Sequence, residues 1–143
     1  MTRGQIVAAL AAFPARLTDV ARAFADADRL NHAGEWGPNE VIRHLIAVEL
    51  EVHQSRLHDL ATSEEPQWVW AEPGPWPGEP ERTLDELLDR FGALRAATLA
   101  TVDGLDDDGW SRTGMHVSLG RWDVEGLLQS AIDHDEEHLA ALR

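Results

Sequence analysis

The chain has 143 residues, of which 43% are hydrophobic, so we expect a single domain with a buried core over residues 1–143. Its 26 acidic and 12 basic side chains give a formal charge of −14, and a surface this negative repels nucleic-acid phosphates and anionic lipids. We therefore expect no nucleic-acid partner and no membrane partner, and no apolar run approaches the roughly 20 residues of a membrane span.

The first predicted helix begins after Thr2, a residue type that caps helix N-termini. Pro14 lies within it and should bend it, because proline has no N–H and crowds the preceding turn. The apolar run at 6–13 belongs to an amphipathic pattern that continues past it, so we interpret it as mature helix, not an export signal, and expect a cytoplasmic protein. One apolar face is predicted from residues spaced by four and three: Ile6, Leu10, Phe13, Leu17, Val20 and Phe24.

The second predicted helix opens at residues 37–40 (Gly-Pro-Asn-Glu), where proline suits the first helical position and Glu40 can cap from the third. A link at residues 31–34, which includes His32, joins it to the first helix. His53 lies nine residues beyond His44, about half a turn out of phase, so we expect it to be solvated. His58 is nearly in phase but roughly 20 Å further along. The predicted inward face is Val41, His44 or Leu45, Val48, Val52 and Ser55.

The third predicted helix begins at a capping box, residues 83–86 (Thr-Leu-Asp-Glu), and runs towards Val102. The fourth begins near Asp123. No strand-like alternation of useful length is present, so the predicted fold is all-α, a four-helix bundle. The inward face of the fourth helix is predicted to be Leu127, Ala131, His134, His138 and Leu142.

Two connections are long for a helical bundle, residues 62–82 and 103–121. Crossover loops of this length allow a non-sequential order of helices. The first contains Trp68, Trp70 and Trp76, which can form a wall over a site or anchor the loop. In the second, the acidic run at 106–109 is expected to cap a short turn that holds Trp110 against the bundle.

Any chemistry here must be carried by histidine, aspartate, glutamate or a bound cofactor, because the chain has no cysteine, lysine or tyrosine. His134 and His138 are four residues apart, so they project from one helix face and can reach a common ion. His44 lies on the inward face of the second helix. Three buried imidazoles cost free energy unless they are satisfied, and a shared divalent ion satisfies all three while leaving coordination positions open.

The alternative is that these histidines are hydrogen-bonded core residues, which is the commoner role for any one of them alone. His116, in the second long loop, is a candidate for the rim of a pocket. Asp135 or Glu40 could accept the second N–H of a ligand imidazole. For Asp135 we favour a solvated charge, because adjacent residues on a helix diverge.

Two segments resemble signatures of the DinB-like superfamily. The first is residues 36–45 (Trp-Gly-Pro-Asn-Glu-Val-Ile-Arg-His-Leu), with Glu49 and Arg56 behind it. The second is residues 133–139 (Asp-His-Asp-Glu-Glu-His-Leu), and a loop with Met115, His116 and Gly120 lies between the two. Their order and spacing match the family along essentially the whole chain.

The resemblance implies a bundle in up-down-down-up order that holds zinc or nickel through the residues matching His44, His134 and His138. It also implies relatives that are metal-dependent hydrolases or S-transferases using a low-molecular-weight thiol such as bacillithiol or mycothiol. Two departures concern positions near the site. Gly37 replaces a frequent serine or threonine, and Ala141 replaces a frequent glutamine, which removes a polar contact but no ligand.

Three functions are therefore open. The first is a metal-dependent enzyme, a thiol S-transferase or hydrolase, that acts on a small molecule. The second is a module that binds a metal or small ligand without turnover, and the third is a metal-free helical interaction protein. The sequence leaves both a monomer and a homodimer open.

Overall fold

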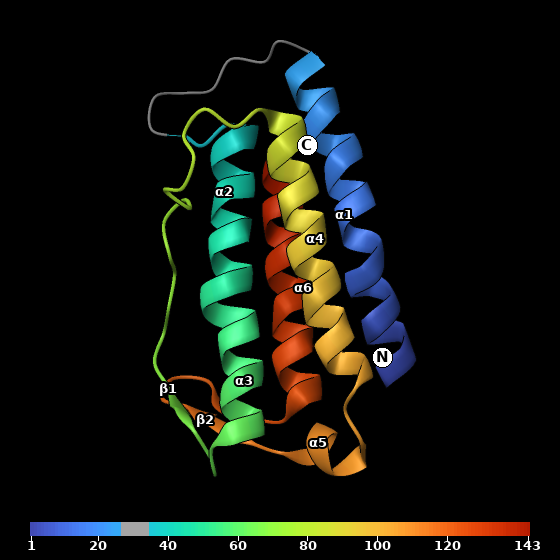
Figure 1. The fold of residues 1–143 in the computed structure, drawn as a ribbon, viewed down its shortest axis with the longest axis vertical. Helices are drawn as coiled ribbons and strands as arrows, with labels where there is room; N and C mark the ends of the chain where they lie inside the picture. The colour runs from blue at the N-terminus through green and yellow to red at the C-terminus, as the bar shows by residue number, and fades with distance from the viewer. Residues whose placement is uncertain (27–34) are drawn as a thin grey trace.

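The computed structural model describes residues 1–26 and 35–143 and shows a bundle of four long helical columns (Figure 1). The predicted link at 31–34, with His32, lies outside the described residues. The predicted class, an all-α four-helix bundle, is confirmed. The columns are α1 (Arg3–Asp26), the continuous run of α2 (Pro38–Val48), the π-helix η1 (Glu49–Gln54) and α3 (Ser55–Thr62), then α4 (Leu84–Asp103) and α6 (Val124–Ala141).

In Figure 1, α1 and α6 run upward, while the α2–α3 column and α4 run downward. The loop at 63–83 therefore has to return along the whole length of the bundle, from the end of α3 to the start of α4. The second long loop stays at the lower end and contains α5 (Asp107–Ser111). The lengthwise course of the first loop matters for the site, because it brings loop residues beside the middle of the bundle.

Side chains cap three helix starts, and the caps at Thr2 and Thr83 were predicted. Thr2 and Gln5 cap α1 reciprocally, with the Gln5 amide donating to Thr2 Oγ1 at 3.1 Å and the Thr2 amide donating to Gln5 Oε1 at 2.8 Å. At α4 the Glu86 amide donates to Thr83 Oγ1 at 3.2 Å. Asp123 caps α6 in the same way, accepting from the Gly126 amide at 2.9 Å.

The start of α2 differs from the prediction. Pro38 is its first residue, as expected, but no side chain caps the helix after Gly37, and Glu40 is exposed. The acidic run in the second loop behaves as predicted: Asp106 accepts from the Gly109 amide at 2.7 Å, and α5 holds Trp110 with only 8% of its surface exposed.

Pro14 leaves α1 uninterrupted but frees a backbone acceptor. Since proline has no N–H, the carbonyl of Leu10, four residues earlier, has no helical donor at that position. Arg95 of α4 uses it instead, donating from Nη1 to the Leu10 oxygen at 3.1 Å. The proline in α1 thus creates a binding point for a buried arginine on another helix.

The π-helix changes which residues of the second column face inward. A π-helix makes i to i+5 hydrogen bonds and has more residues per turn, so the residues that follow lag the α-helical phase by about one position. Accordingly His53, predicted to be solvated, is buried with 6% exposure, and Ser55, predicted to face inward, is exposed. Both predictions were wrong because they assumed an unbroken α-helix.

A small sheet, absent from the sequence prediction, ties the two long loops together. β1 (Gln67–Trp68) pairs in parallel with β2 (Gly114–His116), which pairs antiparallel with β3 (Gly120–Trp122). Strands of two or three residues are too short to give a period-two pattern, so the sequence could not reveal them. The sheet brings the loop that contains His116 beside the returning loop.

Arg43 of α2 holds the upper part of the returning loop. Its Nη1 donates to the carbonyl oxygens of Trp76 and Gly78 at 3.1 and 2.6 Å, and its Nη2 donates to that of Glu79 at 2.7 Å. Trp68 is buried and donates from Nε1 to Asp59 at 3.1 Å, while Trp76 packs on the core. These two tryptophans anchor the loop.

The interior has two apolar clusters with a polar layer between them. One cluster surrounds Phe13 and Phe91, and the other surrounds Leu10, Val102 and Leu127. Five of the eight buried polar residues fall between these clusters, on the second column, α4 and α6: Glu49, His53, Arg95, Thr98 and Asp135. The other three are His44, Arg56 and His116.

Candidate metal centre

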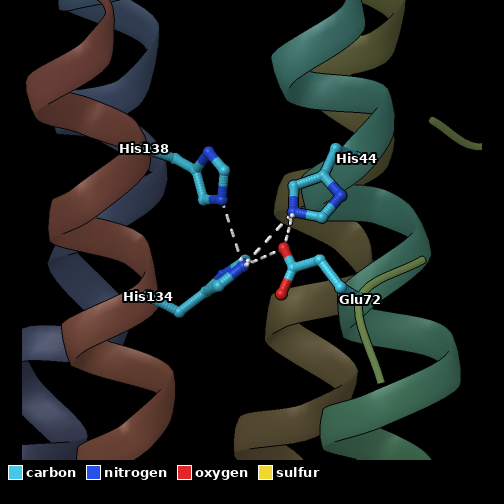
Figure 2. Close-up of side chains that lie close together, drawn as sticks. All are labelled: His44, Glu72, His134 and His138. Carbon is cyan, nitrogen blue, oxygen red and sulfur yellow. Dashed lines mark hydrogen bonds and ion pairs between the residues drawn. The ribbon is translucent and has the colours of Figure 1, made fainter. Parts of the chain in front are cut away.

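Four side chains from three segments converge beside the polar layer (Figure 2). His44 comes from α2, His134 and His138 come from α6, and Glu72 comes from the returning loop. His134 Nε2 lies 3.2 Å from His44 Nε2 and 3.1 Å from His138 Nε2. Glu72 Oε1 lies 3.0 Å from His44 Nε2 and 3.6 Å from His134 Nε2. One ligand atom from each of the four lies within 4.8 Å of the others.

The tautomer of His44 follows from its second nitrogen. His44 is fully buried, and its Nδ1 lies 2.6 Å from the carbonyl oxygen of Pro73. A carbonyl only accepts, so Nδ1 carries the proton and Nε2 presents its lone pair to the cluster. Pro73, the loop residue that follows Glu72, therefore orients the His44 imidazole.

The imidazoles of His134 and His138 are neutral near pH 7. Burial lowers the pKa of His134, and the neighbouring His44 lowers it further. Burial, with His134 and His44 nearby, lowers the pKa of His138 to about 4. Neutral imidazole is the form that binds metal.

The arrangement fits a divalent cation better than a set of hydrogen bonds. With the His44 proton on Nδ1, the lone pair of its Nε2 faces Glu72 Oε1 at 3.0 Å, two acceptors with no proton between them. One N–H on His134 Nε2 can serve only one of its two neighbouring imidazoles. Ligand nitrogens around a tetrahedral zinc, at about 2.1 Å from the metal, stand roughly 3.4 Å apart. The observed separations are close to this value, so the four side chains can hold one ion without a change of fold.

The sequence profile described as the DinB superfamily matches residues 2–142. The chain belongs to the DinB superfamily. The family resemblance found in the two segments is therefore confirmed over nearly the full length.

The fold is similar to that of a solved structure. That structure is YfiT from Bacillus subtilis, described as a probable metal-dependent hydrolase with an unusual four-helix bundle topology. The two structures superpose with a TM-score of 0.76 at 18% sequence identity, over 99% of this chain and 86% of that chain. A comparison with curated proteins finds no match.

The residues expected to orient the ligands do not do so. Glu40 is exposed, and the hydrogen bond to Nδ1 of His44 is made by Pro73. Asp135 is neither solvated, as favoured from the sequence, nor bound to an imidazole: it is 2% exposed and both of its oxygens bind Arg95. The adjacent residue His134 does face the cluster, because neighbouring residues on a helix diverge.

Arg95 is the centre of a closed polar network in the DinB-superfamily bundle. It donates to both Glu49 oxygens at 3.0 and 3.1 Å and to both Asp135 oxygens at 2.9 and 3.0 Å. Thr98 donates to Glu49 at 2.8 Å. Burial alone would raise the pKa of Glu49, but the Arg95 charge holds it below its usual value; burial raises the pKa of Asp135 to about 6.

A cavity of about 60 Å³ adjoins the metal ligands. Its polar side is lined by His53, Arg56 and His116, and it borders Glu72 and His134. His116 was predicted to lie at the rim of a pocket, and it lines this cavity. The residue is 1% exposed, and its Nδ1 accepts from the amides of Ser118 and Leu119, each at 3.1 Å. With Nδ1 an acceptor, the proton of neutral His116 is on Nε2.

The apolar side of the cavity consists of Trp70, Leu119 and Trp122, together with Val48 and Val52. Trp70 is 64% exposed and its ring centroid lies 6.2 Å from that of His116. Of the three loop tryptophans, therefore, Trp70 alone lines this cavity, whereas the other two anchor the loop. The sequence left open whether these tryptophans form a wall over a site or anchor the loop. Trp70 does the first, and Trp68 and Trp76 do the second.

Sequence reasoning missed two residues of the site. Glu72 lies in a loop without periodicity, and only the lengthwise course of that loop brings it to the histidines. His53 was excluded by helical phase, and the π-helix restores it. His58, also on this column, lies outside the cluster, as expected; it is exposed, although the sequence placed it nearly in phase with the inward face.

The described helices include none that is long and apolar enough to cross a bilayer.

Proposed function

We propose that this protein is a metal-dependent enzyme that holds one divalent cation on His44, His134 and His138. The convergence of three imidazole nitrogens with a carboxylate oxygen, beside a cavity, is the observation that carries the proposal. Membership of the DinB superfamily and the likeness to YfiT, described as a probable metal-dependent hydrolase, support it. We propose hydrolysis as the reaction class, on a small molecule.

The donor set favours particular metals. Imidazole suits zinc, nickel, copper and iron, whereas magnesium and calcium prefer sites made of oxygen ligands. Three nitrogens and one carboxylate oxygen therefore favour zinc or nickel. Glu72 is about half-exposed, with 47% of its side chain accessible, so it is the ligand most easily displaced by a substrate.

A bound divalent ion would supply a Lewis acid that lowers the pKa of water or of a thiol in its open position. The chain's own residues do the rest. Pro73 fixes the tautomer of His44, and burial keeps His134 and His138 neutral. Trp70, Leu119 and Trp122 limit the access of water to the cavity and provide an apolar surface for the carbon skeleton of a substrate.

Thiol S-transfer is the second candidate at the same site. The apolar wall of three side chains suits an uncharged electrophile and a polarisable sulfur as well as it suits a hydrolase substrate. A low-molecular-weight thiol would then be a co-substrate and not a resident cofactor. The two candidate reactions differ in their nucleophile, which is water in hydrolysis and a thiol in S-transfer.

The first experiment measures metal content. Purified protein is stripped with chelator, reloaded with zinc or nickel, and analysed for bound metal alongside His138→Ala and His58→Ala. We expect close to one ion per chain in the wild type and in His58→Ala, and a loss of binding in His138→Ala. Equal metal content in all three proteins would refute the site.

The second experiment separates turnover from passive binding. The reloaded protein is screened against ester and amide substrates in water, and against electrophiles with low-molecular-weight thiols. Metal-dependent hydrolysis supports the first candidate, and metal-dependent conjugation supports the second. Metal binding without either reaction favours a passive binding module, and unchanged thermal stability after chelation favours the metal-free interaction protein.

A further inference from the structure

The cavity contains a cation with no carboxylate partner. Arg56 is 9% exposed and lines the cavity, yet no carboxylate in the described ranges lies within 4.0 Å of its nitrogens. Its partners are the carbonyl oxygen of Val69, to which Nη2 donates at 3.1 Å, and the ring of Trp68, 5.5 Å from its Cζ. A buried charge with incomplete pairing costs free energy. The carboxylate on its own helix, Asp59, is bound to Trp68 Nε1 and makes no ion pair with Arg56; burial lowers the pKa of Arg56, and the charge of Asp59 only partly offsets this.

His53 adds a second unused group. It is 6% exposed, it lines the same cavity, and neither of its ring nitrogens has a hydrogen-bond partner within the described part of the chain. A neutral imidazole always presents one N–H donor and one lone pair. Burial is the main cause of the lowered pKa of His53 and of His116, and the Arg56 charge lowers both further. The charge of Arg56 therefore acts on two of the three imidazoles that line the cavity.

We propose that this cavity binds a carboxylate group of the substrate, with the Arg56 guanidinium and the His53 N–H as donors. A guanidinium matches a carboxylate in shape and charge, and a cavity of about 60 Å³ has room for a carboxylate and little more. The subsite borders His134, so a substrate held there has its adjoining atoms at the metal ligands. The substrate class is a small carboxylic acid with its reactive bond close to the carboxylate.

Glu72 also borders the cavity and carries a negative charge, but it does not occupy this subsite. Its Oε1 lies 3.0 Å from His44 Nε2, on the side of the metal ligands, and it makes no ion pair with Arg56. The overall charge of −14 opposes the entry of multiply charged anions more than of monoanions. A monocarboxylate is therefore favoured over phosphate.

The location of the reacting atom rests on the proposed function, but the carboxylate subsite consists of residues outside the ligand set. The test therefore measures binding of acetate to zinc-loaded and to zinc-stripped protein, with acetamide as the uncharged isostere and inorganic phosphate as a second anion. Tryptophan fluorescence reports occupancy, because Trp70 and Trp122 line the cavity. Sodium chloride keeps the ionic strength constant.

The deciding variant is Arg56→Gln, and the matched control is Arg112→Gln, an exposed arginine in the second loop whose loss changes net charge equally. We expect acetate to bind more tightly than acetamide or phosphate in both metal states, and Arg56→Gln to weaken it at least tenfold while Arg112→Gln leaves it unchanged. Acetate binding that is equal in both variants, or that requires zinc and ignores Arg56, overturns the proposal. Tighter binding of phosphate than of acetate also overturns it.

Two further measurements keep the outcome decisive. If Arg56→Gln melts at a much lower temperature than wild type, His53→Phe takes its place: it preserves a buried ring and removes the N–H donor. We expect this variant to remain folded and to bind acetate several-fold more weakly, and full-strength binding refutes the role of His53. Zinc-stripped protein that has lost all activity but still binds acetate supports the carboxylate subsite. This result holds for the subsite even if the proposed metal-dependent function is wrong.

Discussion

The two buried arginines of this bundle have opposite surroundings. Arg95 is 2% exposed and binds two carboxylates and a backbone carbonyl. Arg56 is 9% exposed and has one carbonyl and one tryptophan ring. Each charge came at a desolvation cost, but only the network around Arg95 compensates it within the chain. A buried charge whose partners are all present supports the fold, whereas one whose partners are missing is ready to bind a ligand.

The same helices serve both clusters. His134 and Asp135 are consecutive on α6, yet the first faces the metal ligands and the second faces Arg95. Similarly η1 directs Glu49 to Arg95 and His53 to the cavity. The polar network around Arg95 can therefore hold in place the backbone that carries the metal ligands and the cavity. Substitutions in the Arg95 network and substitutions at the metal ligands or the cavity should have different kinds of effect.

The largest effect is expected from Arg95→Met. This change leaves Glu49 and Asp135 buried without a counter-charge, and breaking such a pair costs about 3–5 kcal/mol. Arg22→Met, which removes an exposed ion pair with Asp85, should cost no more than about 0.5 kcal/mol. Urea denaturation of the metal-free proteins measures both. Equal losses would show that the Arg95 network contributes nothing beyond a surface pair.

Metal binding should raise the free energy of unfolding by a similar amount. At a free zinc concentration 1,000 times the Kd, binding to the folded state adds about 4 kcal/mol. Thermal unfolding with zinc and with chelator measures the difference. His138→Ala should abolish it, while His58→Ala, on an exposed position of α3, should retain it. A zinc-dependent rise in Tm that survives in His138→Ala would mean that the ion binds elsewhere.

The pH dependence of the metal-free protein should contain a contribution from His53, beside those of His134, His138 and His116, whose pKa values burial also lowers; comparison with His53→Phe isolates it. Burial lowers its pKa from 6.5 to about 4, so the unfolded chain takes up a proton at higher pH than the folded chain. Stability is therefore full above pH 6.5 and falls between pH 6.5 and pH 4, by about 3 kcal/mol from this residue. His53→Phe should flatten the curve in this window by about that amount, and an unchanged slope would show that His53 is solvated.

The smallest effect concerns Glu72. Glu72→Gln removes a charged oxygen that lies 3.0 Å from His44 Nε2 but keeps the size of the side chain. We expect zinc affinity to fall by about tenfold, or about 1.4 kcal/mol, with the three imidazoles still binding. Glu81→Gln, an exposed change in the same loop, serves as the control. Competition with a fluorescent zinc chelator measures both, and equal affinities would exclude Glu72 as a ligand.

Most of the helices and three of the four candidate ligands could be predicted from the sequence, because both follow from local periodicity. The caps at Thr2 and Thr83 lie where residue types predicted them, and the fourth helix begins next to Asp123, as predicted. His134 and His138 share a face because they are four residues apart. Whether the protein turns over a substrate, which metal it uses and whether it forms a homodimer stay predictions.

Only the tertiary structure decided how the polar interior is divided. One π-helix shifted the phase of the second column, which brought His53 in and turned Ser55 out. Asp135 proved to be buried because α4 places Arg95 opposite it, a partner 40 residues away in sequence. Glu72 reached the histidines because its loop runs the length of the bundle. Local sequence determines which face a residue occupies on a regular helix. Residues distant in the chain determine which groups that face contacts.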